Sequence, residues 1–337
     1  MFRNNLQRTG VFNTKGVLQA PQSIGKFKTG GMIQSSPTLS ECIVYFGSCD
    51  DNLYALDITT GKEKWRFSTE KYVFSSPAVF NGAVYFGSND EHLYTVDIKT
   101  GLEMWRFATQ GNVKSSPAIS GGVVYFGSWD GNLYAVEINT GKERWRFKTE
   151  DGIDSSPAIS DGLVYFGGWD SHLYALDAVN GQEKWRFKTG GSIMSTPVVS
   201  DGMAYFGNND CDFFAVDINT RKQRWMVSTN GKVTSSAAVF EGVVYFGSGD
   251  ECLYAMDGKT GKERWRFKTE GWIYSSPAIA DGMVYFGSWD KNLYAVDIQT
   301  GQQIWKFQTE DLVESSPCVH DGVVYFGSWD GNLYALR

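Results

Sequence analysis

The stretch YFGSWDGNLYAVEINTGKERWRF, residues 125–147, recurs along this chain with a period of 40 residues. Its first three letters, Tyr-Phe-Gly, begin at eight positions: 45, 85, 125, 165, 205, 245, 285 and 325. No residue is inserted or deleted between the copies. Repeats of this length stack on their neighbours because one unit alone cannot bury its apolar face. The chain is therefore expected to form one array rather than the two or three domains that its 337 residues would otherwise suggest.

Each unit is predicted to contain four short strands. In the third unit they are SSPAI, VVYFGS, NLYAVE and RWRFKT, and turn signals such as DG, WDGN and NTGK separate the strands of the repeat. The fourth strand alternates Trp145 and Phe147 with Arg146 and Lys148, which is the pattern of a half-exposed strand. Four antiparallel strands repeated eight times predict an all-β fold, an eight-bladed β-propeller.

The two ends of the chain are predicted to share the last blade. The eighth unit stops after its third strand, NLYALR, and GKFKT at residues 25–29 lies one period before WRFST at 65–69. An N-terminal strand therefore completes the last blade and closes the ring. We expect residues 1–21 to be an N-terminal extension and residues 22–337 to be a single propeller domain.

A tryptophan motif carries a family resemblance. The spacing Ala-x-Asp-x-x-x-Gly-x-x-x-Trp is ALDITTGKEKW at residues 55–65 and recurs, with single substitutions, in six further units. It resembles the tryptophan-docking motif of propellers with pyrroloquinoline-quinone (PQQ) repeats, a family that includes quinoprotein alcohol dehydrogenases and BamB-like assembly lipoproteins. The glycine suits a turn with positive φ. The resemblance covers essentially the whole chain, and it implies that these residues dock each blade on the next: Trp65, Trp105, Trp145, Trp185, Trp225, Trp265 and Trp305.

The resemblance also implies a cofactor, which this sequence does not support. The dehydrogenases of the family use PQQ with Ca²⁺, a catalytic Asp and a pair of adjacent cysteines. None of the five cysteines here is adjacent to another, and the units lack the insertions that carry much of those active sites. We expect no catalytic residue, metal ligand or cofactor; a quinoprotein-like oxidoreductase with PQQ and Ca²⁺, or a protein that binds a sugar or another small ligand, is the alternative.

A ring of carboxylates is predicted to be structural. Asp recurs in every turn between the second and third strands: Asp50, Asp90, Asp130, Asp170, Asp210, Asp250, Asp290 and Asp330. An Asp side chain often bonds the backbone of its own turn. The alternative is a funnel for cations, but a residue present in all eight units indicates a part of the scaffold.

Bulk properties exclude some partners and leave the compartment open. The net charge of −7 argues against nucleic acid, which attracts basic surfaces. No apolar run approaches the 18 residues of a transmembrane helix. FRNNLQRTG at residues 2–10 resembles the segment that follows the signal peptide in exported proteins of the family, so we expect an extracytoplasmic location, or a cytoplasmic one if Met1 is the true start.

The positions that differ between units point to a binding face. Two sets of loops vary, those before the SSP strands and those between the second and third strands, and both are expected on one side of the ring. They carry Tyr72, Phe74, Trp129, Trp169, Trp272, Tyr274, Trp289 and Trp329. Exposed aromatic residues at this density indicate a surface for a protein or a small ligand; the alternative is drift, with each turn Trp packed on its own blade. We expect a monomeric, non-catalytic binding or assembly scaffold.

Overall fold

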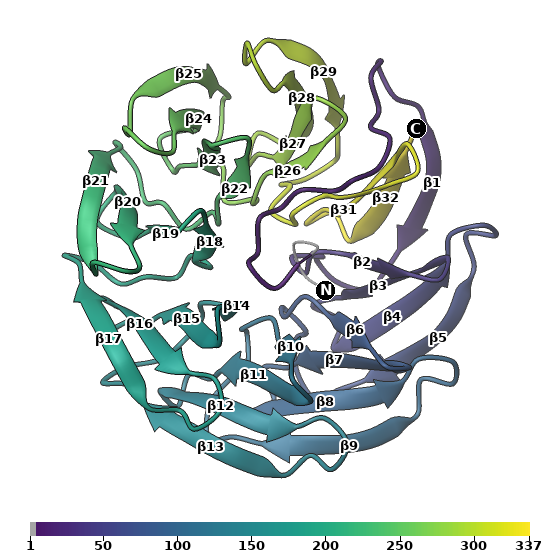
Figure 1. The fold of residues 1–337 in the computed structure, drawn as a ribbon. Coiled ribbons are helices and arrows are strands. Elements are labelled where there is room, and N and C mark those ends of the chain that lie inside the picture. Colours follow the sequence, from purple (N-terminus) through teal and green to yellow (C-terminus); the bar gives the residue numbers. More distant parts are fainter. Residues whose placement is uncertain (1–4) are drawn as a thin grey trace.

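Eight four-stranded antiparallel sheets form a closed ring in the computed structural model, which describes residues 5–337 (Figure 1). There is no helix among these residues. The predicted all-β propeller is confirmed, as is the sharing of the last blade, because β1 pairs with β32 next to the C-terminal end. The question of whether Met1 is the natural start lies outside the described residues.

The blades follow the repeat without interruption, and the strand order within each sheet is the order along the chain except in the shared blade. The strands are β1 (Ser23–Lys28), β2 (Thr38–Ser40), β3 (Ile43–Gly47), β4 (Asn52–Asp57), β5 (Glu63–Ser68), β6 (Ala78–Phe80), β7 (Ala83–Gly87), β8 (His92–Asp97), β9 (Glu103–Ala108), β10 (Ala118–Ser120), β11 (Val123–Gly127), β12 (Asn132–Glu137), β13 (Glu143–Lys148), β14 (Ala158–Ser160), β15 (Leu163–Gly167), β16 (His172–Asp177), β17 (Glu183–Lys188), β18 (Val198–Ser200), β19 (Met203–Gly207), β20 (Asp212–Asp217), β21 (Lys222–Ser228), β22 (Ala238–Phe240), β23 (Val243–Gly247), β24 (Cys252–Asp257), β25 (Glu263–Lys268), β26 (Ala278–Ala280), β27 (Met283–Gly287), β28 (Asn292–Asp297), β29 (Gln303–Gln308), β30 (Cys318–His320), β31 (Val323–Gly327) and β32 (Asn332–Leu336). We number the blades 1 to 8 from β2–β5 to β30–β32, the last with β1.

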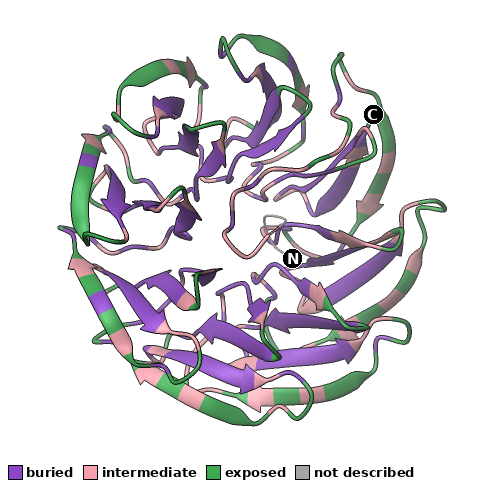
Figure 2. Ribbon diagram, in the orientation of Figure 1, coloured by how far each residue is buried: buried purple, intermediate pink, exposed green. Residues whose placement is uncertain are grey.

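The core lies between blades. The second and third strands of each blade are buried almost throughout, whereas the outer strand alternates between exposed and half-buried residues (Figure 2). In blade 3, Phe126 stacks on Tyr134 with ring centroids 5.4 Å apart, and Phe107 from the outer strand of blade 2 meets Phe126 edge-on at 5.9 Å. Aromatic pairs of this kind contribute beyond the area they bury, so the alternating outer strand joins one blade to the next.

The SSP motif forms a belt of hydrogen bonds around the channel. The Ser36 amide donates to the Ser76 hydroxyl at 2.9 Å, the Ser276 amide donates to Ser316, and the Ser316 amide donates back to Ser36, each at 3.0 Å. The first serine of the motif adds a second bond between blades, as when the Ser315 hydroxyl donates to the Ser35 carbonyl. These bonds satisfy buried polar groups that would otherwise be costly.

The tryptophan motif docks each blade on the next. The Trp65 indole N–H donates to the Ile98 carbonyl of blade 2 at 3.1 Å, and the ring covers Gly101, where an added Cβ would lie 2.6 Å from the indole. Gly101 has φ of +69°, so both the turn and the close approach require glycine. The same contacts recur around the ring, with N–H donors Trp105, Trp145, Trp225 and Trp265 and acceptors Ile138, Ala178, Gly258 and Ile298.

The N-terminal segment, residues 5–21, lies in the channel and on one face rather than apart from the propeller. The inner strands of blades 4 to 7 donate backbone hydrogen bonds to it, as from Ile159 to Leu6 and from Ile279 to Gly10, each at 2.9 Å. Arg8 is fully buried, and its guanidinium donates to the carbonyls of Pro157, Ser116 and Pro117. Figure 1 shows this segment running from the centre of the ring to β1 at its edge.

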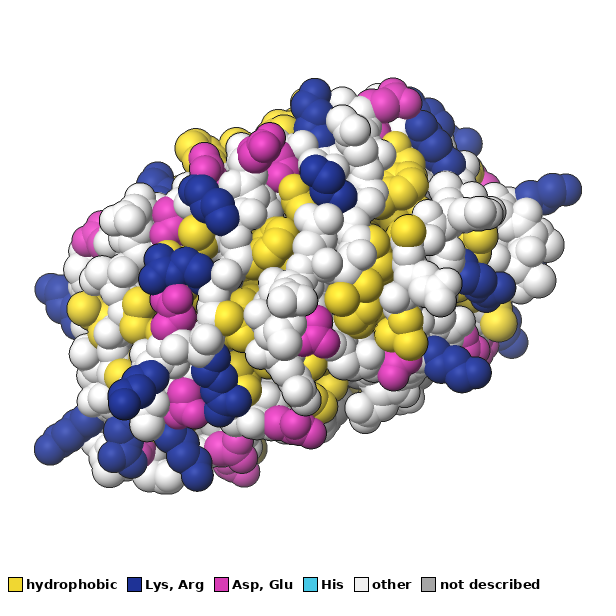
Figure 3. Space-filling model, turned by 90° about the horizontal axis from the view of Figure 1, so that it is seen from above, with side chains coloured by type: hydrophobic (Ala, Val, Ile, Leu, Met, Phe, Trp, Pro, Cys, Tyr) yellow, Lys and Arg dark blue, Asp and Glu magenta, His cyan; other side chains and the backbone are white. Residues whose placement is uncertain are grey.

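The rim of the ring carries mixed charge. In the view of Figure 3, Lys and Arg side chains are interspersed with Asp and Glu side chains, and apolar strips lie between them. Pairs within one outer strand account for part of this pattern, such as Arg66 with Glu63 and Arg146 with Glu143, both at 2.9 Å. The charges of both signs alternate on this side of the molecule and the chain has a net charge of −7, so nucleic-acid binding is not indicated.

Candidate binding face

The two variable sets of loops lie together on one face of the ring. In each blade the turn between the second and third strands donates a backbone hydrogen bond to the loop that precedes the blade, as from Trp129 to Asn112 and from Trp289 to Trp272, both at 2.9 Å. The turn between the first and second strands of a blade contacts the turn between its third and fourth strands on the opposite face. In blade 2, for example, the Ile98 amide donates to the Gly82 carbonyl. The aromatic side chains of the variable loops therefore share one surface, which we call the aromatic face.

One aromatic cluster on this face, the Trp129 cluster, is formed by loops of blades 2, 3 and 4. It consists of Tyr72, Phe74, Lys114, Trp129 and Trp169. The rings of Tyr72 and Phe74 meet at 5.7 Å, and those of Trp129 and Trp169 at 5.8 Å. The ammonium of Lys114 joins the two pairs, since it lies 5.3 Å from the Phe74 ring and 4.1 Å from the Trp129 ring. A cation over an aromatic face is stabilised by the ring quadrupole.

A second cluster, the Trp289 cluster, joins blades 7 and 8. Trp289 lies at its centre, with ring centroids 4.8 Å from Trp272, 5.2 Å from Tyr274 and 5.6 Å from Trp329. Trp272 retains 43% of its surface exposed and Tyr72 in the other cluster 47%. The eight candidate residues are thus brought together in two groups, and none is a buried core residue.

The two clusters are related by four blades, half of the closed ring. Trp129 and Trp289 are equivalent, Trp169 and Trp329 are equivalent, and an acidic residue recurs with them: Asp154 in the first cluster and Glu314 in the second. Since 160 residues separate each pair in a repeat of 40, the clusters lie on opposite sides of the channel mouth. Each pairs two tryptophans with one carboxyl group.

The surroundings of these carboxyl groups favour the protonated form. Burial raises the pKa of Asp154, although the Trp129 indole N–H donates a hydrogen bond to it and Lys114 opposes the rise. Burial likewise raises the pKa of Glu314, against the effect of a hydrogen bond from Gln34 at 3.2 Å. The nearby indole N–H groups of Trp289 and Trp329 also lower the Glu314 pKa through their interaction with its carboxylate.

The sequence placed Lys114, Asp154 and Glu314 among the variable positions but did not single them out. A signal was present, because both acids stand directly before an SSP motif and are separated by the same 160 residues as the tryptophans. The sequence did not show that the carboxyl groups of Asp154 and Glu314 contact the tryptophans of the neighbouring turns. Asp154, in the loop before blade 4, accepts from the Trp129 indole in the turn of blade 3, and the spacing alone does not give the direction of either side chain.

The aspartate ring is structural, as expected. Asp130 accepts from the Asn132 amide of its own turn at 2.9 Å and from the Tyr134 hydroxyl at 2.7 Å. It also accepts from the Gln110 amide of the preceding blade at 2.9 Å, a clamp between blades that the sequence did not predict. Burial raises the pKa of Asp130, but these hydrogen bonds outweigh it and the net shift is downward.

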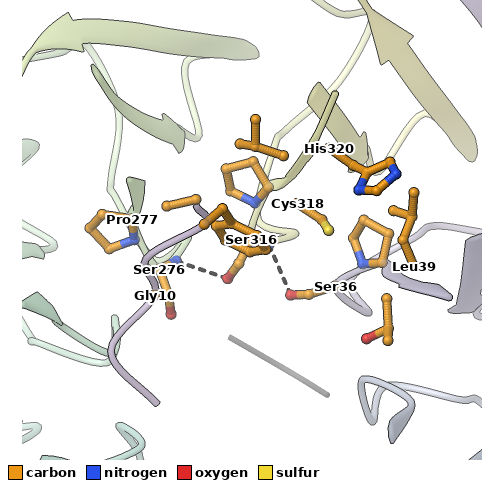
Figure 4. A pocket seen from close by; sticks show the side chains of 14 residues that line it. Gly10, Ser36, Leu39, Ser276, Pro277, Ser316, Cys318 and His320 are labelled. Carbon is orange, nitrogen blue, oxygen red and sulfur yellow. Dashed lines mark hydrogen bonds between the residues drawn. The ribbon is translucent and has the colours of Figure 1, made fainter. Parts of the chain in front are cut away.

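A cavity lies in the channel, between the N-terminal segment and blades 7, 8 and 1 (Figure 4). Its volume is about 100 Å³, and Gly10, Ser36, Pro277, Cys318 and His320 are among the residues that line it. Burial raises the pKa of the Cys318 thiol to about 12. Because the thiolate is the reactive form of cysteine, Cys318 is unsuited to nucleophilic chemistry at neutral pH.

Two family models match the chain. One, described as the β-propeller of the beta-alanine-activating enzyme, matches residues 95–283, more than half of the chain; the other, described as the outer membrane protein assembly factor BamB, matches residues 11–148. The chain belongs to the first of these families, and the two matches together identify it as a PQQ-like β-propeller. No curated protein sequence matches it.

Solved structures of PQQ-like propellers and related rings share the fold of this chain. BamB from Moraxella catarrhalis aligns with a TM-score of 0.83 at 18% identity, over 94% of this chain and 100% of that chain. A europium-containing methanol dehydrogenase aligns at 0.87 and 14%, over 100% of this chain and 97% of the other. The computationally designed Ika8 protein aligns at 0.84 and 21%, over 93% and 99%. At these identities the likeness concerns the fold alone.

The residues of this PQQ-like propeller do not fit the cofactor of the family's dehydrogenases. Within residues 5–337, no three His, Cys, Asp or Glu side chains lie together as a metal-binding group. The five cysteines are separate free thiols. No helix in that part of the chain is long and apolar enough to cross a membrane. The separate cysteines and the absence of a metal-binding group in the described residues differ from the donor set of a PQQ–Ca²⁺ site.

Proposed function

We propose that this PQQ-like propeller is a non-catalytic binding scaffold and that its aromatic face takes a protein partner. The observation that carries the proposal is the pair of partly exposed aromatic clusters at opposite sides of one face. A few buried aromatic anchors usually dominate the energy of a protein interface. The opposite face offers near-identical turns in each blade, which give little basis for selecting one partner.

The test is a double substitution on this face. Trp272→Ala with Tyr72→Ala removes one exposed ring from each cluster, and we expect it to weaken partner binding by about 2 kcal/mol or more. The fold should survive because both side chains project from variable loops. A partner is first captured with the wild-type chain, then purified and titrated by calorimetry against both proteins.

The matched control is Lys142→Ala with Lys262→Ala, two exposed residues in turns of the opposite face. We expect this variant to bind as the wild type does. Equal loss of binding in both variants, or full binding by the aromatic variant at an unchanged melting temperature, would contradict the proposal.

A small ligand is the second candidate for the same face. The rings of Trp289 and Trp329 lie 5.6 Å apart and are partly exposed, so they offer stacking surfaces for a sugar or another small ligand. Titration of neutral sugars followed by tryptophan fluorescence tests this function. Saturable quenching that Trp329→Ala abolishes would favour it over a protein partner.

A further inference from the structure

The outer strand of blade 8 lacks the docking tryptophan that the other seven blades have. Seven blades place a tryptophan at this repeat position, but blade 8 has Gly25 of β1 there, paired with Ala335. The register is unchanged, because Ala55 pairs with Trp65 in the same way in blade 1. Only the side chain is missing.

At the junction of blades 8 and 1, the groups that contact an indole at the other junctions are present but have no indole to contact. Gly61 of blade 1 has φ of +67° and would meet nothing within 4 Å of an added Cβ, whereas Gly101 in the same turn of blade 2 is covered by Trp65. The Ile58 carbonyl corresponds to the Ile98 carbonyl that accepts from Trp65, and it has no hydrogen-bond partner among residues 5–337. Tyr325 corresponds to Tyr45, whose ring lies 5.7 Å from that of Trp65.

The missing ring leaves a groove at the junction of blades 8 and 1. Its volume is about 240 Å³, and its lining includes Gly25, Val44, Leu56, Tyr325 and Ala335. For comparison, a dry apolar cavity of about 150 Å³ in another protein binds benzene. Ile24 at the groove is 54% exposed, so apolar surface continues from the groove to the solvent.

We propose that this groove binds the indole ring of a tryptophan side chain from a partner polypeptide. The indole N–H donates to the Ile58 carbonyl, the ring covers Gly61, and Tyr325 flanks it. An indole is the expected ligand because the docking tryptophans occupy the equivalent position, with the same backbone contacts, at the other junctions. The site does not depend on the aromatic face, and the turn residues Thr59 and Thr60 beside it lie on the opposite face.

N-acetyl-tryptophanamide is the probe, and methyl NMR of the wild-type chain is the readout. We expect saturable shifts of the methyl groups of Val44, Leu56 and Ile58, with a dissociation constant of about 1 mM or tighter. Ile98 is the internal control, because Trp65 already occupies its junction. The 1-methyl derivative, which cannot donate to Ile58, should bind at least about threefold more weakly. N-acetyl-leucinamide should cause no saturable shift.

Substitution at Gly25 gives the matched pair of variants. Gly25→Trp fills the groove from within and should abolish the shifts, whereas Gly25→Ala leaves room for the ring and should retain them, since an added Cβ would lie 3.7 Å from that of Ala335. Absence of shifts in the wild type, shifts spread equally over all junctions, or unchanged binding by a folded Gly25→Trp variant would each overturn the proposal. If Gly25→Trp does not fold, the methyl mapping decides alone.

Discussion

The indole N–H of Trp305 donates a 2.7 Å hydrogen bond to the carbonyl of Val17, 288 residues earlier in the chain. For Trp65, Trp105, Trp145, Trp225 and Trp265 that carbonyl belongs to the next blade. Val17 also donates from its amide to the Tyr285 hydroxyl at 2.8 Å, and it is 6% exposed. The N-terminal part of the chain therefore closes the ring twice: β1 forms the outer strand of blade 8, and Val17 of the N-terminal segment accepts from the docking residue of blade 7.

Removal of residues 1–30 should destabilise the propeller at this closure. The deletion takes away β1, the Val17 carbonyl and the buried Arg8, and it exposes the edge of β32. Exposed strand edges recruit other chains. We expect a lower melting temperature and loss of the monomeric state by light scattering; an unchanged temperature and mass would contradict this role of the N-terminal segment.

Arg221→Gly should stabilise the fifth blade. Arg221 stands where other blades have the turn glycine, and its φ is +62°. The left-handed conformation is costly for residues other than glycine, although glycine also raises the entropy of the unfolded chain. We expect a net gain of about 0.5–1 kcal/mol in the free energy of unfolding, measured by urea denaturation.

The control for Arg221→Gly is Gly181→Ala in blade 4, which introduces the opposite change. An added Cβ there would lie 2.6 Å from the Trp145 ring, and the φ of Gly181 is +71°. We expect a clear loss of stability from that substitution. Equal effects of the two variants would show that the turn conformation does not limit the stability of the blade.

Glu314→Gln should change how stability depends on pH. Burial raises the pKa of Glu314 above its usual value of 4.5, so the folded state holds this proton more tightly than the unfolded state does. The free energy of unfolding then falls as pH rises from about 4.5 through the folded pKa. Glutamine removes this fall, so the variant should melt higher than the wild type at pH 8 and near it at pH 4. Glu150→Gln, at an exposed position, is the control and should leave the profile unchanged.

PQQ with Ca²⁺ should not bind tightly. The expectation comes from the donor set, since the cysteines of this chain are not adjacent and no metal-binding group of acids, histidines or thiols gathers in the part of the chain that the structure describes. Absorbance and calorimetric titration measure it directly. Micromolar binding together with dye-linked alcohol oxidation would make the oxidoreductase the better hypothesis.

The sequence by itself determined the architecture, because a strict 40-residue period leaves few ways to bury each apolar face. The four strands of each blade followed from turn glycines and period-two alternation, and the shared last blade followed from the missing strand of the eighth unit. The docking role of the tryptophans was implied by the family resemblance. The first strand was predicted over SSPAI in the third unit, but the structure begins it at Ala118, because the serines before it bond to the neighbouring blades instead. The same repetition also predicted that the variable loops share one face. Each of these features depends on residues close together in the chain or separated by whole repeats.

Only the tertiary structure decided the contacts that cross the ring. Arg8 is buried in the channel against blades far from it in the chain, and the Val17 carbonyl accepts from Trp305, 288 residues later. The structure also showed that the aromatic face divides into two clusters around Asp154 and Glu314, formed by side chains of neighbouring blades. Sequence spacing places a residue on a blade, but it does not give the direction of a side chain in a loop. The vacancy beside Gly25 illustrates the difference: the sequence shows a missing tryptophan, and the structure shows an accessible groove with its acceptor still in place.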